Sequence, residues 1–332
     1  MKIFVIGGLG FIGSNYLNKY VVEDDENEYF CLDILNNVGS LYNIKEIENH
    51  KNFKFIECDI NNRDLVIEVF KKYRPKIVLN FAAETSVDYS FVNPAIFFRT
   101  NVLGLKNLLD ASILVKVDRF LEVSTDEVYG DVDLYDFTTK FKETDKLNPK
   151  NSYSESKAQG DLLCLSYVKD KNLNVVVTRS TNNYGPHQFC DKLIPLVIYR
   201  CLKNQDIEIY GNGQNIRDWI YVEDNCKAIH EVLLKGKKGN IYNIGAGYFY
   251  SNISVAQNIL KIIKESRSTI KFVVGRKVND LKYALDYAKL LNEIKDLSFL
   301  VFDDGLVKTI NWYISNIEFL NESIMKKSLL SR

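Results

Sequence analysis

Short apolar runs alternate with longer amphipathic stretches through the first half of the chain. The runs are rich in β-branched and aromatic residues, and the stretches between them repeat apolar residues at helical spacing. This alternation is typical of a parallel sheet whose strands are joined by crossover helices, so we predict a doubly wound α/β sheet from Lys2 to about Val177. The expected strands are Lys2–Ile6, Tyr29–Leu32, Phe53–Glu57, Ile77–Phe81, Phe120–Ser124 and Val175–Thr178, and the expected helices are Leu65–Lys72, Ala95–Ser112 and Tyr153–Lys169.

The regular alternation breaks after Arg179. Glycine-bearing loops, single strands such as Ile207–Tyr210 and helices such as Ser254–Lys264 follow, which predicts a smaller α/β substrate-binding lobe. We expect a first domain over residues 1–180 and a second over 181–332, with the chain crossing back to the first lobe around 215–245. Ligands of doubly wound sheets bind beyond the carboxyl ends of the strands, so the cleft there is the expected site.

Composition removes several classes of function. Lys and Arg number 43, as do Asp and Glu, so net charge attracts the protein to neither nucleic acid nor an anionic membrane. The six cysteines are scattered without a C-x-x-C pair and only three histidines occur, so we expect no metal site. Several cysteines lie in apolar runs, which suits buried thiols in a reducing compartment. No apolar run is long enough for a signal peptide or a membrane span, and we expect a soluble cytoplasmic protein.

A glycine cluster joins the first strand to the first helix. Gly7, Gly10 and Gly13 allow a tight turn and a close approach to a pyrophosphate, which the N–H groups of the helix N-terminus also attract. Asp33 ends the second strand, where an acid accepts hydrogen bonds from adenosine ribose hydroxyls and favours NAD over NADP. The pattern predicts a Rossmann fold that binds NAD. The expected cofactor residues here are Gly7, Gly10, Phe11, Ile12, Gly13 and Asp33, followed by Asp59 and Ile60, which either border the adenine or leave Asp59 as a helix cap.

Tyr153 and Lys157 stand four residues apart on a predicted helix, so both side chains project from one face. An ammonium near a phenol favours the phenolate and lowers the tyrosine pKa from about 10. Tyr153 is therefore a candidate base for a sugar hydroxyl. Taken alone, this spacing also suits a solvated helix face.

A hydroxyl and two adjacent carboxyls, Thr125, Asp126 and Glu127, follow the strand Phe120–Ser124. Alone they suit a strand-end turn or a helix cap. Combined with the glycine cluster and the Tyr/Lys pair, they make the chain resemble the extended short-chain dehydrogenase/reductase family, in its sugar-nucleotide epimerase/dehydratase branch. The Thr-Asp-Glu triplet resembles that of dTDP-glucose 4,6-dehydratases. Further segments that carry the resemblance are 182–186, 192–195, 210–213, 217–219 and 242–245, so it spans nearly the whole chain.

The resemblance implies a hydro-lyase with internally recycled NAD, acting on a nucleotide-activated hexose in deoxysugar biosynthesis, such as that of rhamnose. The implied reaction takes dTDP-glucose to dTDP-4-keto-6-deoxyglucose by C4 oxidation, elimination of water across C5 and C6, and hydride return to C6. By resemblance, Tyr153 takes the C4 hydroxyl proton, Glu127 is the base at C5 and Asp126 is the acid at C6. Thr125 hydrogen-bonds the C4 oxygen, and Lys157 binds the nicotinamide ribose.

Further binding residues follow only from the resemblance, which also implies a homodimer paired through Ala95–Ser112 and Tyr153–Lys169. NAD contacts are expected from Phe81, Ala82, Ala83, Thr100 and Asn183, in addition to Tyr153 and Lys157. Sugar-nucleotide contacts are expected from Thr85, Asn182, Lys192, Leu193, Tyr210, Arg217, Asn252 and Arg276, in addition to Thr125.

Two segments depart from the family pattern. The chain reads Thr85-Ser86-Val87-Asp88-Tyr89 where the family commonly has Ser-His-Val-Asp-Arg, and residues 275–280 lack the usual Pro-Gly turn and histidine. These departures leave UDP-glucose or an amino-sugar nucleotide open as the substrate. The sequence is also compatible with a 4-epimerase or decarboxylase that uses the same NAD and Tyr/Lys core, and with a non-catalytic sugar-nucleotide binder.

Overall fold

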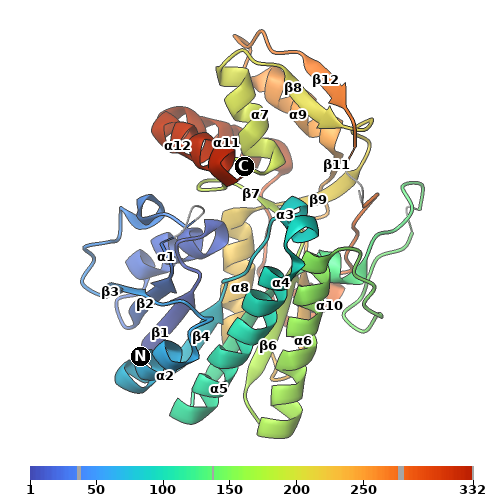
Figure 1. Ribbon diagram of the computed structural model, residues 1–332. Helices are drawn as coiled ribbons and strands as arrows, with labels where there is room; N and C mark the ends of the chain where they lie inside the picture. The colour runs from blue at the N-terminus through green and yellow to red at the C-terminus, as the bar shows by residue number, and fades with distance from the viewer. Residues whose placement is uncertain (36–38, 137, 276–279, 331–332) are drawn as a thin grey trace.

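The computed structural model describes the chain except for residues 36–38, 137, 276–279 and 331–332. Figure 1 shows a large lower part built on a central sheet and a smaller upper part formed mainly by later segments. The lower part holds both the N-terminus and the strands that the sequence predicts for the first domain. The upper part holds the C-terminal helices.

The large part is a parallel sheet of seven strands in the order β10-β6-β5-β4-β1-β2-β3. Every neighbouring pair is parallel, and the order runs outward from β1 in both directions, which confirms the predicted doubly wound fold. All the carboxyl ends therefore meet at one edge. The strands are β1 Lys2–Ile6, β2 Glu28–Asp33, β3 Phe53–Glu57, β4 Ile77–Asn80, β5 Arg119–Thr125, β6 Val175–Ser180 and β10 Ile241–Ile244.

Helices cover both faces of this sheet, and each face has its own apolar core. On one face α1 packs beside α8, and Leu17, Val21 and Ile229 meet the side chains of β1 and β2. On the other face α2 packs over β1 and β2 and against α5, α5 packs against α6, and α6 packs over β5 and β6. The helices are α1 Phe11–Glu23, α2 Arg63–Tyr73, α5 Leu105–Val115, α6 Ser152–Lys171 and α8 Val222–Lys235, with the short α10 Ala288–Glu293 beside β10.

Two features of the large part differ from the predicted elements. The seventh strand, β10, comes from the second half of the chain and pairs with β6. The single helix expected over Ala95–Ser112 is three segments: α4 Pro94–Phe98, a π-helical turn η2 over Arg99–Gly104, and α5. The hydrophobic spacing continues across a π-turn, so it does not reveal the extra residue that the turn inserts.

The smaller part packs two small sheets against four helices around a third apolar cluster that includes Tyr184, Trp219 and Phe302. Strand β7 continues directly from β6, so the two parts share the chain at the carboxyl edge of the large sheet. The strands are β7 Asn182–Tyr184, β8 Ile207–Tyr210, β9 Ile216–Tyr221, β11 Phe249–Ser251 and β12 Ile270–Val273, and the helices are α7 Leu193–Leu202, α9 Asn252–Ile262, α11 Phe302–Ser315 and α12 Ile317–Leu330.

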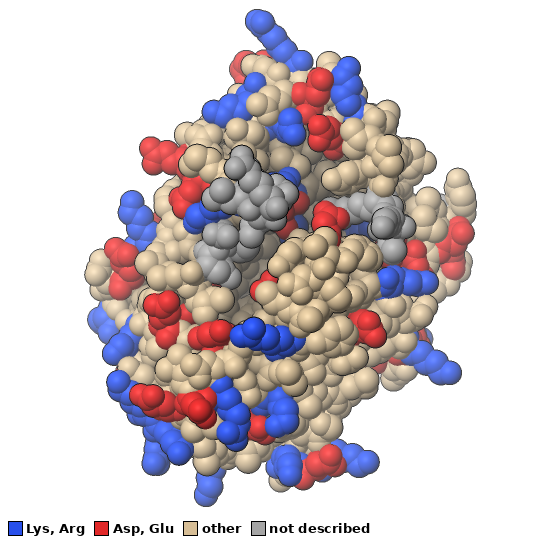
Figure 2. Space-filling model, in the orientation of Figure 1, with Lys and Arg blue, Asp and Glu red and all other residues tan. Residues whose placement is uncertain are grey.

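On the face shown in Figure 2, acidic and basic side chains are interspersed. Within the described part of the chain, no helix has the length and apolar character needed to cross a bilayer. The same residues contain no cluster of His, Cys, Asp and Glu suited to a metal ion.

Candidate active site

The glycine cluster forms the turn between β1 and α1. Gly7 has a φ of +75°, and a Cβ there would lie 2.4 Å from the Ala82 nitrogen at the end of β4. A Cβ on Gly13 would lie 2.4 Å from the Gly7 carbonyl oxygen. Only glycine therefore permits this close turn, which leaves the first N–H groups of α1 at the carboxyl edge of the sheet. The cradle fits a dinucleotide pyrophosphate.

Asp33 closes this turn from the end of β2. Its Oδ2 accepts a hydrogen bond from the Leu9 N–H at 2.8 Å, and its Oδ1 accepts one from the Ile34 N–H at 2.7 Å. Burial raises the pKa of Asp33 to about 6, against the lowering effect of these two bonds. Each carboxylate oxygen has a second lone pair, which suits the ribose hydroxyls of NAD.

The residues that follow β3 form a turn rather than a helix cap. Asp59 Oδ1 accepts from the Asn61 N–H at 2.8 Å and from Asn61 Nδ2 at 3.0 Å, whereas Asn62 is the residue that caps α2. Asn61 Nδ2 also reaches Thr100 Oγ1 at 3.3 Å. These bonds bring Asp59, buried Ile60 and Thr100 together after β3, the strand that pairs with β2.

The segment after β4, residues 81–85, is held by a residue that the sequence did not single out. Asn101, in the π-turn η2, accepts from the Glu84 N–H at 2.8 Å and donates to the Glu84 carbonyl at 3.1 Å. Its Nδ2 also donates to Ser156 Oγ on α6 at 2.9 Å. The π-turn thus fastens the strand end that carries Phe81, Ala82, Ala83 and Thr85 to the helix that carries the Tyr/Lys pair.

Helix α6 presents Tyr153 and Lys157 to the carboxyl edge. Asn151 caps the helix, and its side chain and that of Ser154 form a reciprocal capping box, which fixes the first turn. The Lys157 ammonium donates to Glu122 Oε1 at 2.6 Å and to the Val123 carbonyl at 2.8 Å. Both contacts lie on β5, so the lysine is bound to the strand that leads to the acid pair.

The expected lowering of the Tyr153 pKa is wrong for this structure. Burial raises the pKa of Tyr153 well above 10, and the negative charge of Glu127 adds to it, while a hydrogen bond with Thr125 opposes them. The charge of Lys157 is paired with Glu122. A paired ammonium exerts less net field on a neighbouring phenol than a free one.

The acid pair occupies a single turn, η3 Asp126–Tyr129, directly after β5. Thr125 Oγ1 accepts from the Glu127 N–H and donates to Asp126 Oδ1, both at 3.3 Å. Among the described residues, Asp126 Oδ2 is buried without a hydrogen-bond partner. Asn151 Nδ2 donates to Glu127 Oε2 at 3.4 Å. The local structure is therefore a cap-like turn, as one interpretation of the sequence held, but it leaves a buried carboxyl oxygen available to a ligand.

Asp126 and Glu127 differ in the neighbouring charges that act on their pKa values. Burial raises the pKa of Asp126 well above its usual range, and the neighbouring Glu127 raises it further. Burial also raises the pKa of Glu127, as does Asp280, whereas Arg217 lowers it. Adjacent carboxyls in a site of this kind hold one proton between them, so one can serve as an acid while the other serves as a base.

Unpartnered polar atoms line the end of β6 as well. Thr181 Oγ1, Asn182 Oδ1 and Asn183 Oδ1 are buried, and no described residue bonds to them. The Asn183 amide nitrogen donates to the Thr181 carbonyl at 2.9 Å, which orients the oxygen. Buried oxygens of this kind are normally satisfied, so this region is built for the polar groups of a ligand. Together with the glycine cradle and Asp33, it fits NAD.

Positive side chains from the smaller part face the same turn. Arg217 on β9 donates to the Asp280 carbonyl at 3.0 Å and lies 4.5 Å from the ring centre of Tyr283. Lys192 precedes α7 and reaches the Thr85 carbonyl at 3.3 Å. Both cations lower the pKa of Glu127, so both lie within electrostatic range of the acid pair. Tyr283, which the sequence did not single out, is buried and donates to the Asp280 carboxylate.

The remaining expected substrate residues lie farther out on the smaller part. Leu193 begins α7, Tyr210 ends β8 and Asn252 begins α9. The loop from Tyr210 to Asn215 joins the last two, since the Asn252 N–H donates to the Asn215 carbonyl at 3.1 Å. Arg276 lies outside the described residues.

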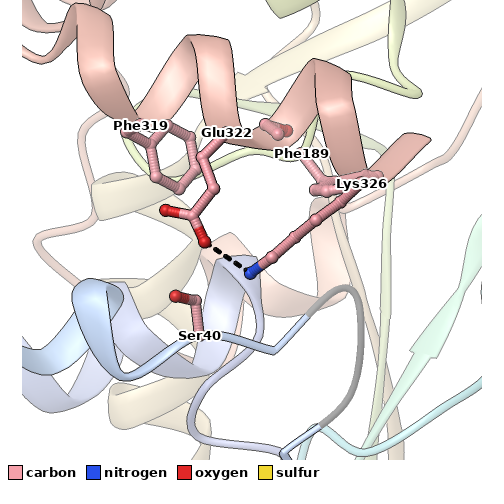
Figure 3. Close-up of a pocket in the computed structure, with 6 residues that line it drawn as sticks. Ser40, Phe189, Phe319, Glu322 and Lys326 are labelled. Carbon is pink, nitrogen blue, oxygen red and sulfur yellow. Dashed lines mark ion pairs between the residues drawn. The ribbon is translucent and has the colours of Figure 1, made fainter. Parts of the chain in front are cut away.

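A separate small hollow lies between α12 and the segment after β2 (Figure 3). An ion pair of 2.7 Å between Glu322 and Lys326 crosses its mouth, and Phe189 and Phe319 form part of its wall. None of the predicted catalytic residues lines it. The chemistry therefore gathers at the carboxyl edge of the large sheet.

Comparison with known proteins agrees with this geometry. Low-salt glycan biosynthesis protein Agl12 of Haloferax volcanii is 40% identical over 321 residues, which cover 96% of this chain and 100% of that protein. The dTDP-glucose 4,6-dehydratase of an Actinoplanes species is 39% identical, covering 95% of this chain and 98% of the relative. The crystal structure of dTDP-glucose 4,6-dehydratase from Bacillus anthracis in complex with NAD superposes with a TM-score of 0.89 at 37% identity, covering 97% of this chain and 99% of that one.

The family assignment rests on nearly the whole chain. The profile of the GDP-mannose 4,6 dehydratase family matches residues 4–297, from the first strand through the segment that holds Asp280 and Tyr283. The match therefore includes the glycine cradle, the acid pair and the Tyr/Lys helix. This chain belongs to the GDP-mannose 4,6 dehydratase family.

Proposed function

We propose that the protein is an NAD-dependent hydro-lyase that converts dTDP-glucose to dTDP-4-keto-6-deoxyglucose. The observation that carries the proposal is the pair of carboxyls of buried Asp126 and half-buried Glu127, which lie beside Tyr153 at the edge of a glycine cradle that fits NAD. A 4-epimerase needs no acid and base for C5 and C6. Full-length relatives named dTDP-glucose 4,6-dehydratase support the choice of reaction and substrate.

The acid pair serves the elimination step. The C5 proton of a sugar becomes acidic only once C4 is a ketone. When bound, NAD supplies the hydride acceptor for C4 and the hydride donor for C6. Glu127 then removes the C5 proton and Asp126 protonates the departing C6 hydroxyl. The proton that burial retains on Asp126 suits the acid, and the hydrogen bond from Asn151 and the charges of Arg217 and Lys192 suit an ionised Glu127.

Tyr153 and its neighbours serve the first proton transfer. Tyr153 accepts the proton of the C4 hydroxyl, and Thr125, which hydrogen-bonds Tyr153, also holds the C4 oxygen. Lys157 binds the nicotinamide ribose with the N–H bond that it does not donate to Glu122 or Val123.

Cofactor and nucleotide occupy opposite walls of the cleft. NAD lies along Gly7, Gly10, Phe11, Ile12 and Gly13, with Asp33 on its adenosine ribose, and it contacts Asp59, Ile60, Phe81, Ala82, Ala83, Thr100 and Asn183. The free oxygen of Asn183 and the cradle at Gly7 support this placement. The sugar nucleotide contacts Thr85, Asn182, Lys192, Leu193, Tyr210, Arg217 and Asn252, and an arginine fork suits its diphosphate. We propose domains 1–180 and 181–332, with the chain crossing back to the first around 215–245; the packing of α8 on α1 and the pairing of β10 with β6 support the crossing.

The protein is a homodimer paired through α5 and α6. Leu103, in the π-turn that leads into α5, is 58% exposed, and Leu162 on α6 is 59% exposed. Large apolar side chains on two neighbouring helices are a surface that a second copy would bury. A cytoplasmic location is supported by the six cysteines, all buried and free, which suit a reducing compartment.

Incubation of the purified protein with dTDP-glucose and, separately, UDP-glucose tests the proposal. The readouts are the alkaline chromophore of a 4-keto-6-deoxy sugar and the mass loss of one water. Product from dTDP-glucose supports reaction and nucleotide together. Product from UDP-glucose alone keeps the reaction and overturns the nucleotide. No product from either, with NAD bound, overturns the activity.

A further inference from the structure

A buried carboxylate sits behind the lysine of the Tyr/Lys pair. Glu122 is fully buried in the middle of β5, where its Oε1 lies 2.6 Å from the Lys157 ammonium. Its Oε2 accepts from Asn80 Nδ2 on β4 at 2.7 Å. Asn80 in turn accepts from the Ala82 N–H at 3.2 Å, in the segment that meets the glycine turn. The carboxylate is therefore fixed from two strands and one helix.

The buried Glu122–Lys157 ion pair contributes little net stability to the fold, which favours a role for it in the site. Burying an ion pair removes two charges from water, and this desolvation cost offsets much of their attraction. Well-packed apolar side chains at the same place often stabilise a fold as much as the ion pair does. The same helix already carries another buried ion pair, Asp161 with Arg179 at 2.8 Å. That pair continues into a structural network, because Arg179 also donates to the Tyr129 hydroxyl at 2.7 Å. The Glu122 pair instead ends at Lys157, one turn from Tyr153.

Several charged or titratable groups surround this point. On α6 they are Lys157, Asp161 and Cys164, and on the turn after β5 they are Asp126 and Glu127. Of these, Glu127, Asp126 and Asp161 disfavour a phenolate at Tyr153. Lys157 is the cation nearest to it along the helix, and Glu122 is the group that offsets that cation.

Building on the proposed function, we propose that Glu122 is a positioning residue that holds the Lys157 ammonium against β5, offsets its charge and so sets the pH at which Tyr153 accepts the substrate proton. Two of the three N–H bonds of Lys157 are committed to β5, which directs the third toward the cofactor ribose. Asn80 keeps Glu122 in place and ties it to the end of β4. Glu122 touches neither substrate nor cofactor and acts through Lys157.

The test compares the native protein with Glu122→Gln, with NAD at saturation. The phenolate of Tyr153 is titrated by ultraviolet difference absorbance, and subtraction of the matching Tyr153→Phe protein isolates its signal. Without Glu122 the ammonium is no longer offset, so Tyr153 should ionise at a pH lower by about one to two units, the effect of one charge at short range. KM for dTDP-glucose should change by less than about twofold, because Glu122 touches no part of the substrate.

A matched control removes a carboxylate from a lysine pair at the other end of the same strand. Asp118 pairs with Lys76 at 3.3 Å on the surface, and Asp118→Asn should leave the Tyr153 titration unchanged. If Glu122→Gln leaves that titration unchanged as well, or moves it to higher pH, the proposal is overturned. The titration needs no turnover, so a native protein that makes no product overturns the proposed function without affecting this result.

A second variant covers the case in which Glu122→Gln does not fold because Lys157 is left unpaired. Glu122→Asp keeps the charge but withdraws the carboxylate by one methylene. Its Tyr153 titration should lie within about 0.3 pH unit of the native one, while kcat falls about fivefold because Lys157 is displaced. A Glu122→Asp protein with native kcat, or with a titration shifted by a full unit, overturns the proposal.

Discussion

The two ends of the cleft are built differently. At the reacting end Thr125, Asp126 and Lys157 are buried, and each is bonded to groups on β5 or in the turn that follows it. At the end where we propose that the nucleotide binds, called the nucleotide end below, the Lys192 side chain is 39% exposed and Tyr210 is 47% exposed. The bonds that Lys192 and Arg217 donate there go to backbone carbonyls, which a ligand phosphate can replace.

This difference separates rate from affinity. Burial shifts the pKa values of Asp126, Glu127 and Tyr153 upward, so the reacting end is set for proton transfer before substrate arrives. The partly exposed cations at the nucleotide end act through charge and geometry on groups that do not react. Substitutions at the first end should therefore change kcat, and substitutions at the second should change KM.

The largest expected effect comes from the acid pair. Asp126→Asn and Glu127→Gln should each lower kcat about 10²- to 10⁴-fold, because each removes a positioned proton-transfer group. The two should differ in deuterium exchange at C5, measured by mass spectrometry of recovered substrate in heavy water. Asp126→Asn keeps the base and should exchange, whereas Glu127→Gln should not.

Asp133→Asn is the matched control, since it removes an exposed carboxylate six residues after Glu127 and should leave kcat unchanged. Exchange in Glu127→Gln but not in Asp126→Asn would reverse the assignment of acid and base. If both variants had the native kcat, neither Asp126 nor Glu127 would transfer a proton in the reaction, and the proposed difference between the two ends would be wrong.

The pH dependence is the next largest effect. Glu127 must be ionised to act as a base, and its pKa is raised, so kcat should fall as the pH drops through that raised value. Asp126 must be protonated to act as an acid, and its pKa is raised well above its usual range, so kcat should also fall as the pH rises through that value. We expect a bell-shaped profile with limbs of about tenfold per pH unit. An alkaline limb that survives in the residual activity of Asp126→Asn would contradict this assignment.

The sequence was most informative where one local rule decides the structure. Each of the six strands predicted for the first domain is present within two residues at either end, because short β-rich runs bounded by glycine and polar residues are a strong local indication of buried strands. The strand β10 was not among them, although the chain was expected to cross back to the first lobe around 215–245; its short run follows the break in the regular alternation, so periodicity alone did not mark it as a strand. The π-turn at Asn101 was missed for a related reason: its Asn side chain acts through Glu84 and Ser156, which no spacing rule connects.

The candidate site shows the same limit. Each predicted motif is a short local pattern: the glycine turn with Asp33, the acid pair, and Tyr153 with Lys157. The structure brings these motifs together at the carboxyl edge of the large sheet. Glu122 did leave a signal, a lone carboxylate within an apolar strand, but its partner is 35 residues away. The expected pKa of Tyr153 was wrong mainly because the fold buries the phenol beside Glu127, which spacing along a helix does not reveal. Spacing indicates that a lysine lies near a tyrosine, but not whether its charge is already offset.

At the nucleotide end Arg217→Lys should raise KM for dTDP-glucose about tenfold with kcat within about threefold of native. Lysine keeps the charge but loses the planar fork that binds two phosphate oxygens and stacks 4.5 Å from the ring centre of Tyr283. Steady-state kinetics provides the measurement. If kcat fell a hundredfold while KM stayed native, Arg217 would act mainly on the reaction, through the effect of its charge on Glu127. It would then be part of the reacting end, and the boundary between the two ends would be wrong.

The smallest effect should come from Lys192, whose exposed ammonium is already paired with Asp191 at 3.1 Å. An exposed charge contributes about 1 kcal/mol or less and is screened by salt, so Lys192→Gln should raise KM about two- to fivefold at low ionic strength. The difference from native should shrink in high salt, because screening removes the contribution that the variant lacks. Measuring KM across a salt series also sharpens the comparison of the two ends. If the effect persisted in high salt, Lys192 would contact the substrate in a place from which water is excluded. It would then resemble the buried Lys157 more than an exposed lysine.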